Sequence, residues 1–201
     1  MSNVNRRNFA FILLLLGGIL AVFLLEVVAP EQILSHGLVP RTQRGLVGIA
    51  TMPFLHADRA HLTGNLVSLV VLLGFMFIFH SRQMIVDVLL IALAGGLLLW
   101  LFGRSAVHIG ASGLIYGLAG FMIVAGITHR RLLEVVAAVA VAVFYGNSLF
   151  WGALPFQPGV SWDGHLAGAL GGALVGLRSR AASGGARIPE KQSLAERELK
   201  L

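Results

Sequence analysis

The sequence contains no cysteine, which excludes disulfide frameworks, thiolate metal sites and cysteine nucleophiles. Charged residues are also scarce, at 12% of the chain, whereas a soluble domain carries about 25%. Apolar residues instead make up 57% of the 201 positions. A water-soluble monomer is therefore not expected, and any nucleophile must be a serine, a threonine or another side chain without a thiol.

The apolar residues form long runs, and a helix that crosses a membrane needs about 20 of them. Six runs approach that length: residues 9–29, 61–79, 84–102, 112–128, 132–151 and 164–177. The fourth and sixth are short, so they span only if their ends are buried among other helices or reached by water. We predict an all-α membrane protein made of a cytoplasmic N-terminus (1–8), a six-span domain (9–177) and a polar cytoplasmic tail (178–201).

Basic residues indicate the orientation of the spans, because Lys and Arg near span ends are retained on the cytoplasmic side. With the N-terminus inside, the outer segments hold Arg41, Arg44, Arg59 and Arg104, and the other eleven of the 15 basic residues are inside, six of them in the tail. Both termini are therefore predicted to be cytoplasmic. The same scatter argues against a nucleic-acid partner, since the basic residues form no single patch.

Three polar groups interrupt otherwise apolar spans: His61 with Asn65, Ser112 with Tyr116, and His165. In the predicted orientation the second, fourth and sixth spans all run from outside to inside, so these groups fall near the outer ends of their helices. Within each pair the residues are four positions apart and share a helix face. The sequence therefore predicts one polar site that opens toward the outer side of the membrane.

Glycine spacing predicts that the fourth and sixth spans approach closely. Gly113 and Gly117 mark one face of the fourth span, and the sixth has a glycine at every fourth position, at Gly164, Gly168, Gly172 and Gly176. Ser112 and His165 are then expected within hydrogen-bond reach of each other.

A serine next to a histidine points to nucleophilic catalysis, because a neutral imidazole can remove the hydroxyl proton. His165 begins its helix, where the positive end of the dipole disfavours the imidazolium. Ser112 begins another helix, which leaves its backbone N–H free to face an oxyanion. Asn65 is a candidate side-chain donor to the same oxyanion, with His61 as a second.

A third, acidic member of the site is not expected. Asp163 is only two residues before His165 and is predicted to cap that helix, and Asp58 lies in a loop. We therefore favour a dyad of Ser112 and His165, with Tyr116 packed against the imidazole in place of an acid.

These motifs resemble those of the rhomboid family. Residues 110–117 (GASGLIYG) resemble its GxSGxxYG motif, residues 61–65 (HLTGN) its HxxxN element, and residues 164–172 (GHLAGALGG) its HxxGxxxG element. The resemblance extends over residues 9–177. In the first outer loop, where many members carry Trp-Arg, this chain has Gln43-Arg44, which leaves the anchoring of that loop open.

The resemblance implies an intramembrane serine protease that cleaves membrane-anchored proteins in or beside their transmembrane segment, without a cofactor. Its implied site residues are Ser112 (nucleophile), His165 (base), Asn65 and His61 (oxyanion donors), Tyr116, Gly110 and Gly113 (supporting), and Gly117, Gly168 and Gly172 (helix packing). Its implied partners are transmembrane substrates and the lipid bilayer, and a multispan body with small loops fits a bacterial plasma membrane.

Three alternatives compete with this interpretation. On its own, Ser112 would more simply be a small residue for helix packing. The histidines His56, His61, His108 and His165 suggest a metal transporter or metalloprotease, but the sequence has no HExxH helix and no carboxylate at a matching depth. A catalytically inactive rhomboid-like protein with a binding or quality-control role is the last alternative, although such proteins typically lack the serine or the histidine.

Overall fold

The computed structural model describes residues 1–152 and 160–184, without the side chains of residues 142, 144–152 and 180–184. The predicted all-α class is confirmed, since the described residues form helices joined by loops, with one isolated β-bridge between Leu38 and His108. The long helices are α1 (Asn3–Val28), α4 (Arg59–Phe79), α5 (Met84–Phe102), α6 (Ser112–His129), α7 (Leu132–Gly152) and α8 (Trp162–Gly184). The loop between α1 and α4 holds α2 (Pro30–Leu34), α3 (Gln43–Thr51) and the 3₁₀ helix η1 (Met52–Phe54).

Each predicted apolar run corresponds to one long helix. The run at 84–102 has the same limits as α5, and the first helix begins earlier than predicted, at Asn3. The largest difference is at the end of α8, which continues to Gly184 instead of ending at residue 177. No proline or glycine lies between positions 177 and 183, so nothing stops the helix there. The first part of the predicted polar tail is therefore helical.

Four helices among the described residues are long and apolar enough to cross a membrane: α1, α4, α5 and α6. In α1 only 11% of the most apolar window is buried within the protein, so most of its side chains are left to face lipid. These apolar helices indicate an integral membrane protein.

The loop between α1 and α4 is folded and attached to the bundle. Thr42 caps α3 by accepting a hydrogen bond from the Gly45 N–H. Arg41 donates to the Gly103 carbonyl (2.8 Å), while Trp100 of α5 donates its indole N–H to the Thr42 carbonyl (2.9 Å). The loop is thus anchored on the end of α5 without a Trp-Arg pair in the loop itself.

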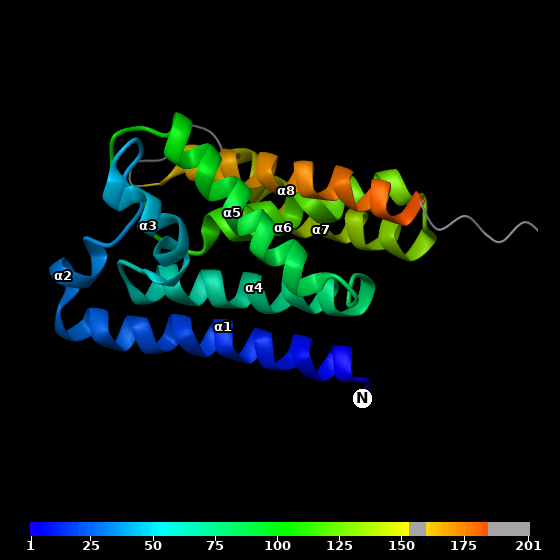
Figure 1. Ribbon diagram of the computed structural model, residues 1–201, viewed down its shortest axis with the longest axis horizontal. Helices are drawn as coiled ribbons and strands as arrows, with labels where there is room; N and C mark the ends of the chain where they lie inside the picture. Colours follow the sequence, from blue (N-terminus) through cyan, green and yellow to red (C-terminus); the bar gives the residue numbers. More distant parts are fainter. Residues whose placement is uncertain (153–159, 185–201) are drawn as a thin grey trace, which may run out of the picture.

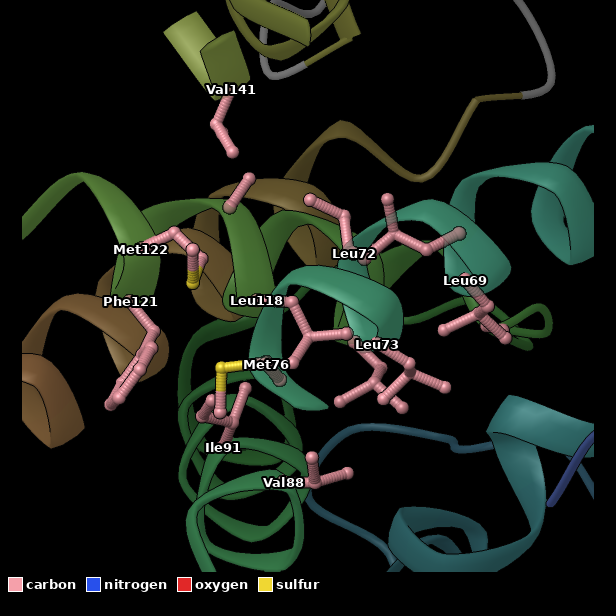
Figure 2. Packing of buried hydrophobic residues seen from close by; sticks show 14 of the residues in the cluster. Leu69, Leu72, Leu73, Met76, Val88, Ile91, Leu118, Phe121, Met122 and Val141 are labelled. Atoms are coloured by element: carbon pink, nitrogen blue, oxygen red, sulfur yellow. The ribbon is translucent and has the colours of Figure 1, made fainter. Parts of the chain in front are cut away.

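A buried apolar core fixes α6 among its neighbours. Figure 2 shows this packing between Leu69, Leu72, Leu73 and Met76 of α4, Val88 and Ile91 of α5, and Leu118, Phe121 and Met122 of α6. Of these residues, none is more than 2% exposed. Such a core restrains the position of α6 because close-packed interiors leave little room for sliding.

Helices α4, α6 and α8 all begin at the same end of the molecule, beside α2 and α3 (Figure 1). The first turns of these three helices carry the polar groups predicted from the sequence. The fold therefore gathers residues from distant parts of the chain around one end of the bundle.

Candidate functional site

A tight turn leads into α6 and places Ser112 at the first position of that helix. Gly110 in this turn has φ +105°, a conformation that L side chains rarely adopt. Its N–H donates to the Met52 carbonyl of η1 (3.0 Å). Ser112 is half-buried, and as the first residue of a helix it has an N–H without an intrahelical acceptor.

His165 lies in the first turn of α8 and stacks on Tyr116 of α6. The two ring centroids are 4.1 Å apart and the ring planes differ by 8°. Tyr116 lies one helical turn after Ser112, on the same face of α6. The stacking therefore brings the imidazole to the face of α6 that begins with Ser112.

Glycines join α6 and α8 by direct contact of their backbones. A Cβ atom built on Gly168 would lie 2.0 Å from the carbonyl oxygen of Gly113, and one built on Gly172 would lie 1.8 Å from that of Gly117. Real Cβ atoms essentially never approach other atoms so closely, so larger residues at these positions would force the helices apart. We call this contact line of Gly113, Gly117, Gly168 and Gly172 the glycine seam.

The first turns of α4 lie against the turn at Gly110, which precedes Ser112. A Cβ atom on Gly110 would lie 2.6 Å from Nε2 of His61 and 3.4 Å from Nδ2 of Asn65. Asp58 caps α4 by accepting a hydrogen bond from the His61 N–H (2.8 Å). Both predicted oxyanion donors are thus next to the turn that precedes Ser112, and only a glycine at position 110 leaves them room.

His56 belongs to the same polar cluster, although the sequence suggested it only as an unlikely metal ligand. Its ring packs edge-on against His61, with centroids 5.0 Å apart, and its Nε2 lies 2.9 Å from Nδ2 of Asn65. His56 is 1% exposed and Asn65 is 7% exposed. The only sequence signal was a histidine shortly before α4, which does not reveal its partner.

The prediction that Asp163 caps α8 is wrong. Its carboxylate instead accepts hydrogen bonds from the backbone N–H (2.8 Å), Nε (3.2 Å) and Nη2 (3.1 Å) of Arg104. The Arg104 guanidinium also lies 5.3 Å from the Trp162 ring. His108, in the same loop, hydrogen-bonds Ser161 (2.7 Å) and the Arg104 carbonyl (3.0 Å). This cluster joins the start of α8 to the loop after α5.

The histidines and carboxylates at this end of the molecule also bear on the alternative of a metal site. Among the residues that are described, no group of three His, Asp or Glu side chains is arranged to hold a metal ion. The functional groups at this end of the molecule are a hydroxyl, an imidazole and several N–H donors, which are the groups that an acyl-transfer site needs.

Comparisons with known proteins agree with the motifs. Residues 43–181 match the family model of the Rhomboid domain. An uncharacterised protein of Mycobacterium bovis is 34% identical over 163 residues, which cover 77% of this chain and 68% of the relative. An uncharacterised protein of Mycobacterium tuberculosis gives the same values. One of Mycobacterium leprae is 36% identical over 140 residues, covering 65% of this chain and 55% of the relative.

Proposed function

The chain belongs to the rhomboid family, and from this premise we propose that it is an intramembrane serine endopeptidase. It hydrolyses a peptide bond in or near the transmembrane segment of membrane-anchored proteins, with Ser112 as nucleophile and His165 as base. The main support for this proposal is the stacking of His165 of α8 on Tyr116 of α6, with ring centroids 4.1 Å apart. The backbones of these two helices are in direct contact at the glycine seam.

The reaction begins when the Ser112 hydroxyl attacks the scissile carbonyl and passes its proton to the neutral His165 imidazole. The carbonyl oxygen becomes an oxyanion, which accepts hydrogen bonds from the Ser112 N–H and from Asn65, with His61 as a further donor. His165 then gives its proton to the leaving amine as the peptide C–N bond breaks. A water molecule hydrolyses the resulting acyl ester by the same two proton transfers and restores the serine.

Two features support a dyad over a triad. The Asp163 carboxylate is held by three nitrogen atoms of Arg104, which directs it toward the loop after α5. The parallel stacking on Tyr116 restricts the tilt of the His165 ring, which is the function that an acid performs in a triad.

The proposed topology has six spans, with α7 and α8 added to the four helices that meet the length and hydropathy criteria. Both termini are cytoplasmic, and the site opens to the outer face. The mycobacterial relatives favour a bacterial plasma membrane. Substrates are expected to carry small or helix-weakening residues near that face, because a stable helix hides its carbonyl groups in intrahelical hydrogen bonds.

The proposal is tested by purifying the full chain in detergent and incubating it with a fluorescent transmembrane substrate. The parent is compared with Ser112→Ala and His165→Ala, and a fluorophosphonate probe reports whether Ser112 is a reactive nucleophile. We expect cleavage and labelling by the parent and neither by Ser112→Ala. A folded parent that is not labelled and cuts no substrate would favour the inactive, rhomboid-like binding protein.

A further inference from the structure

A buried carboxylate on α1 is connected to the site through two hydrogen bonds that the proposed mechanism does not use. Glu26 is 4% exposed, and its two oxygen atoms accept from the His56 backbone N–H at 3.0 and 3.2 Å. Figure 1 shows α1 and α4 side by side, with the C-terminal end of α1 near the start of α4.

The His56 ring continues this connection to Asn65. Its Nδ1 lies 3.3 Å from the Phe54 carbonyl and its Nε2 lies 2.9 Å from Nδ2 of Asn65. A carbonyl and an amide NH₂ can both be satisfied by one tautomer only, with the proton on Nδ1 and the lone pair on Nε2. Burial, with His61 nearby, lowers the pKa of His56 to about 4, so the ring is neutral and accepts at neutral pH.

This arrangement uses one of the two N–H bonds of the Asn65 amide and leaves the second to point elsewhere. Nδ2 lies beside Gly110, since a Cβ there would be 3.4 Å away, and Gly110 is two residues before Ser112. The bond to His56 thus fixes the rotation of the amide group, and with it the direction of the second N–H.

We propose that Glu26 and His56 are positioning residues, which orient the Asn65 amide toward the oxyanion of the proposed peptidase. Glu26 holds the backbone of His56, and the His56 ring holds Asn65. An apolar residue at position 26 would be cheaper to bury in a membrane helix, and ionisable residues in such helices usually serve function. The inference rests on the proposed function, because it assigns these two residues a role in that reaction alone.

The test compares two matched pairs of variants with the detergent assay. His56→Phe keeps the ring but removes the acceptor, whereas His56→Gln keeps an acceptor oxygen. Glu26→Leu removes the carboxylate, whereas Glu26→Gln keeps an oxygen for the His56 N–H. Loss of an oxyanion donor lowers kcat by about 100- to 1000-fold. We expect His56→Phe and Glu26→Leu to lower kcat by roughly 10- to 100-fold with KM nearly unchanged, and the Gln variants to stay near the parent.

A merely structural role is separated by repeating the four substitutions in an Asn65→Ala background. If His56 and Glu26 act through Asn65, their substitution has little further effect on kcat in the Asn65→Ala background, because the effects of coupled residues are not additive. The same fold-loss in both backgrounds would overturn the inference, as would full kcat in His56→Phe. Should His56→Phe not fold, the Glu26→Leu and Glu26→Gln pair decides by the same criterion. If the folded parent neither cleaves the substrate nor reacts with the fluorophosphonate, the proposed function itself is wrong. That outcome differs from equal losses of kcat in the two backgrounds, which would overturn only the role of Glu26 and His56.

Discussion

The glycine seam gives the sharpest prediction, because a single methyl group at Gly168 has no space. The built Cβ lies 2.0 Å from the Gly113 carbonyl oxygen, 2.8 Å from its carbonyl carbon and 3.1 Å from its Cα. All three contacts are with backbone, so no side chain can move aside. Gly168→Ala must therefore push α8 away from α6.

The size of the displacement follows from ordinary contact distances. A carbon and a carbonyl oxygen approach to about 3.3 Å, so the 2.0 Å contact requires the helices to separate locally by about 1.3 Å. Overpacking of this kind costs about 1–3 kcal/mol of stability. A misplacement of about 1 Å between reacting groups costs about 100-fold in rate. Because His165 is one turn before Gly168, we expect kcat of Gly168→Ala to fall about 100-fold.

The assay measures kcat on a fluorescent transmembrane substrate and the unfolding midpoint in a denaturing detergent. Gly74→Ala in α4 is the matched control, since nothing lies within 4 Å of its built Cβ. An alanine there favours the helix by about 1 kcal/mol, so both quantities should stay at or above the parent. If Gly168→Ala keeps kcat within about threefold of the parent, close approach at the seam does not align the two groups.

Four further predictions concern single residues. Asp163→Asn should slow cleavage by less than about tenfold, whereas His165→Ala should lose at least about 100-fold; equal losses in kcat would mean that the acid orients the base. Asn65→Ala should lower kcat with KM nearly unchanged, because its hydrogen bond strengthens in the transition state, and a change confined to KM would contradict this role. Gly110→Ala should lose about 1–3 kcal/mol of stability, measured by detergent unfolding, because its φ is +105°; a parent-like midpoint would exclude strain in the turn. The folded pKa of His56, lowered to about 4 from 6.5, lies below the unfolded value, so its contribution to stability is present above pH 6.5 and is lost as the pH falls toward 4. The unfolding midpoint of the parent should drop more than that of His56→Gln over this window.

The sequence predicted the long helices well because each is encoded locally. A run of about 20 apolar residues has few alternatives to a helix in a membrane, and α5 accordingly keeps its predicted limits at Met84 and Phe102. The end of α8 was missed because hydropathy falls at Arg178 while helix propensity does not. The helix continues through polar residues to Gly184.

Asp163 illustrates why a local rule failed at the site. A helix cap contributes typically about 1 kcal/mol, whereas each hydrogen bond to a charged group contributes about 1.5–3 kcal/mol. Asp163 receives hydrogen bonds from three nitrogen atoms of Arg104, 59 positions away. Even with the discount for the exposed guanidinium, the ion pair outweighs the cap. Spacing in the sequence cannot indicate such a partner.

The connection from Glu26 to Asn65 was missed for a related reason. Glu26 and His56 are 30 positions apart, and they meet only because α1 packs beside α4. Their presence in and before apolar spans was visible, but their pairing depends on how the bundle assembles. Pairs within one helix, such as His61 with Asn65, were predicted because helical periodicity alone sets them on one face.

The described contacts divide the site into two parts that meet at residues 110–113. Backbone contacts of the glycine seam set Ser112 and His165 relative to each other, and they leave little freedom for adjustment. In the other part, the Met52 carbonyl of η1 accepts a hydrogen bond from the Gly110 N–H, and the side chains of His61 and Asn65 of α4 lie against Gly110. Substitutions at the seam should therefore impair both nucleophilic attack and stability. Changes around Asn65 should act on the oxyanion alone, and so leave fluorophosphonate labelling of Ser112 less affected than peptide cleavage.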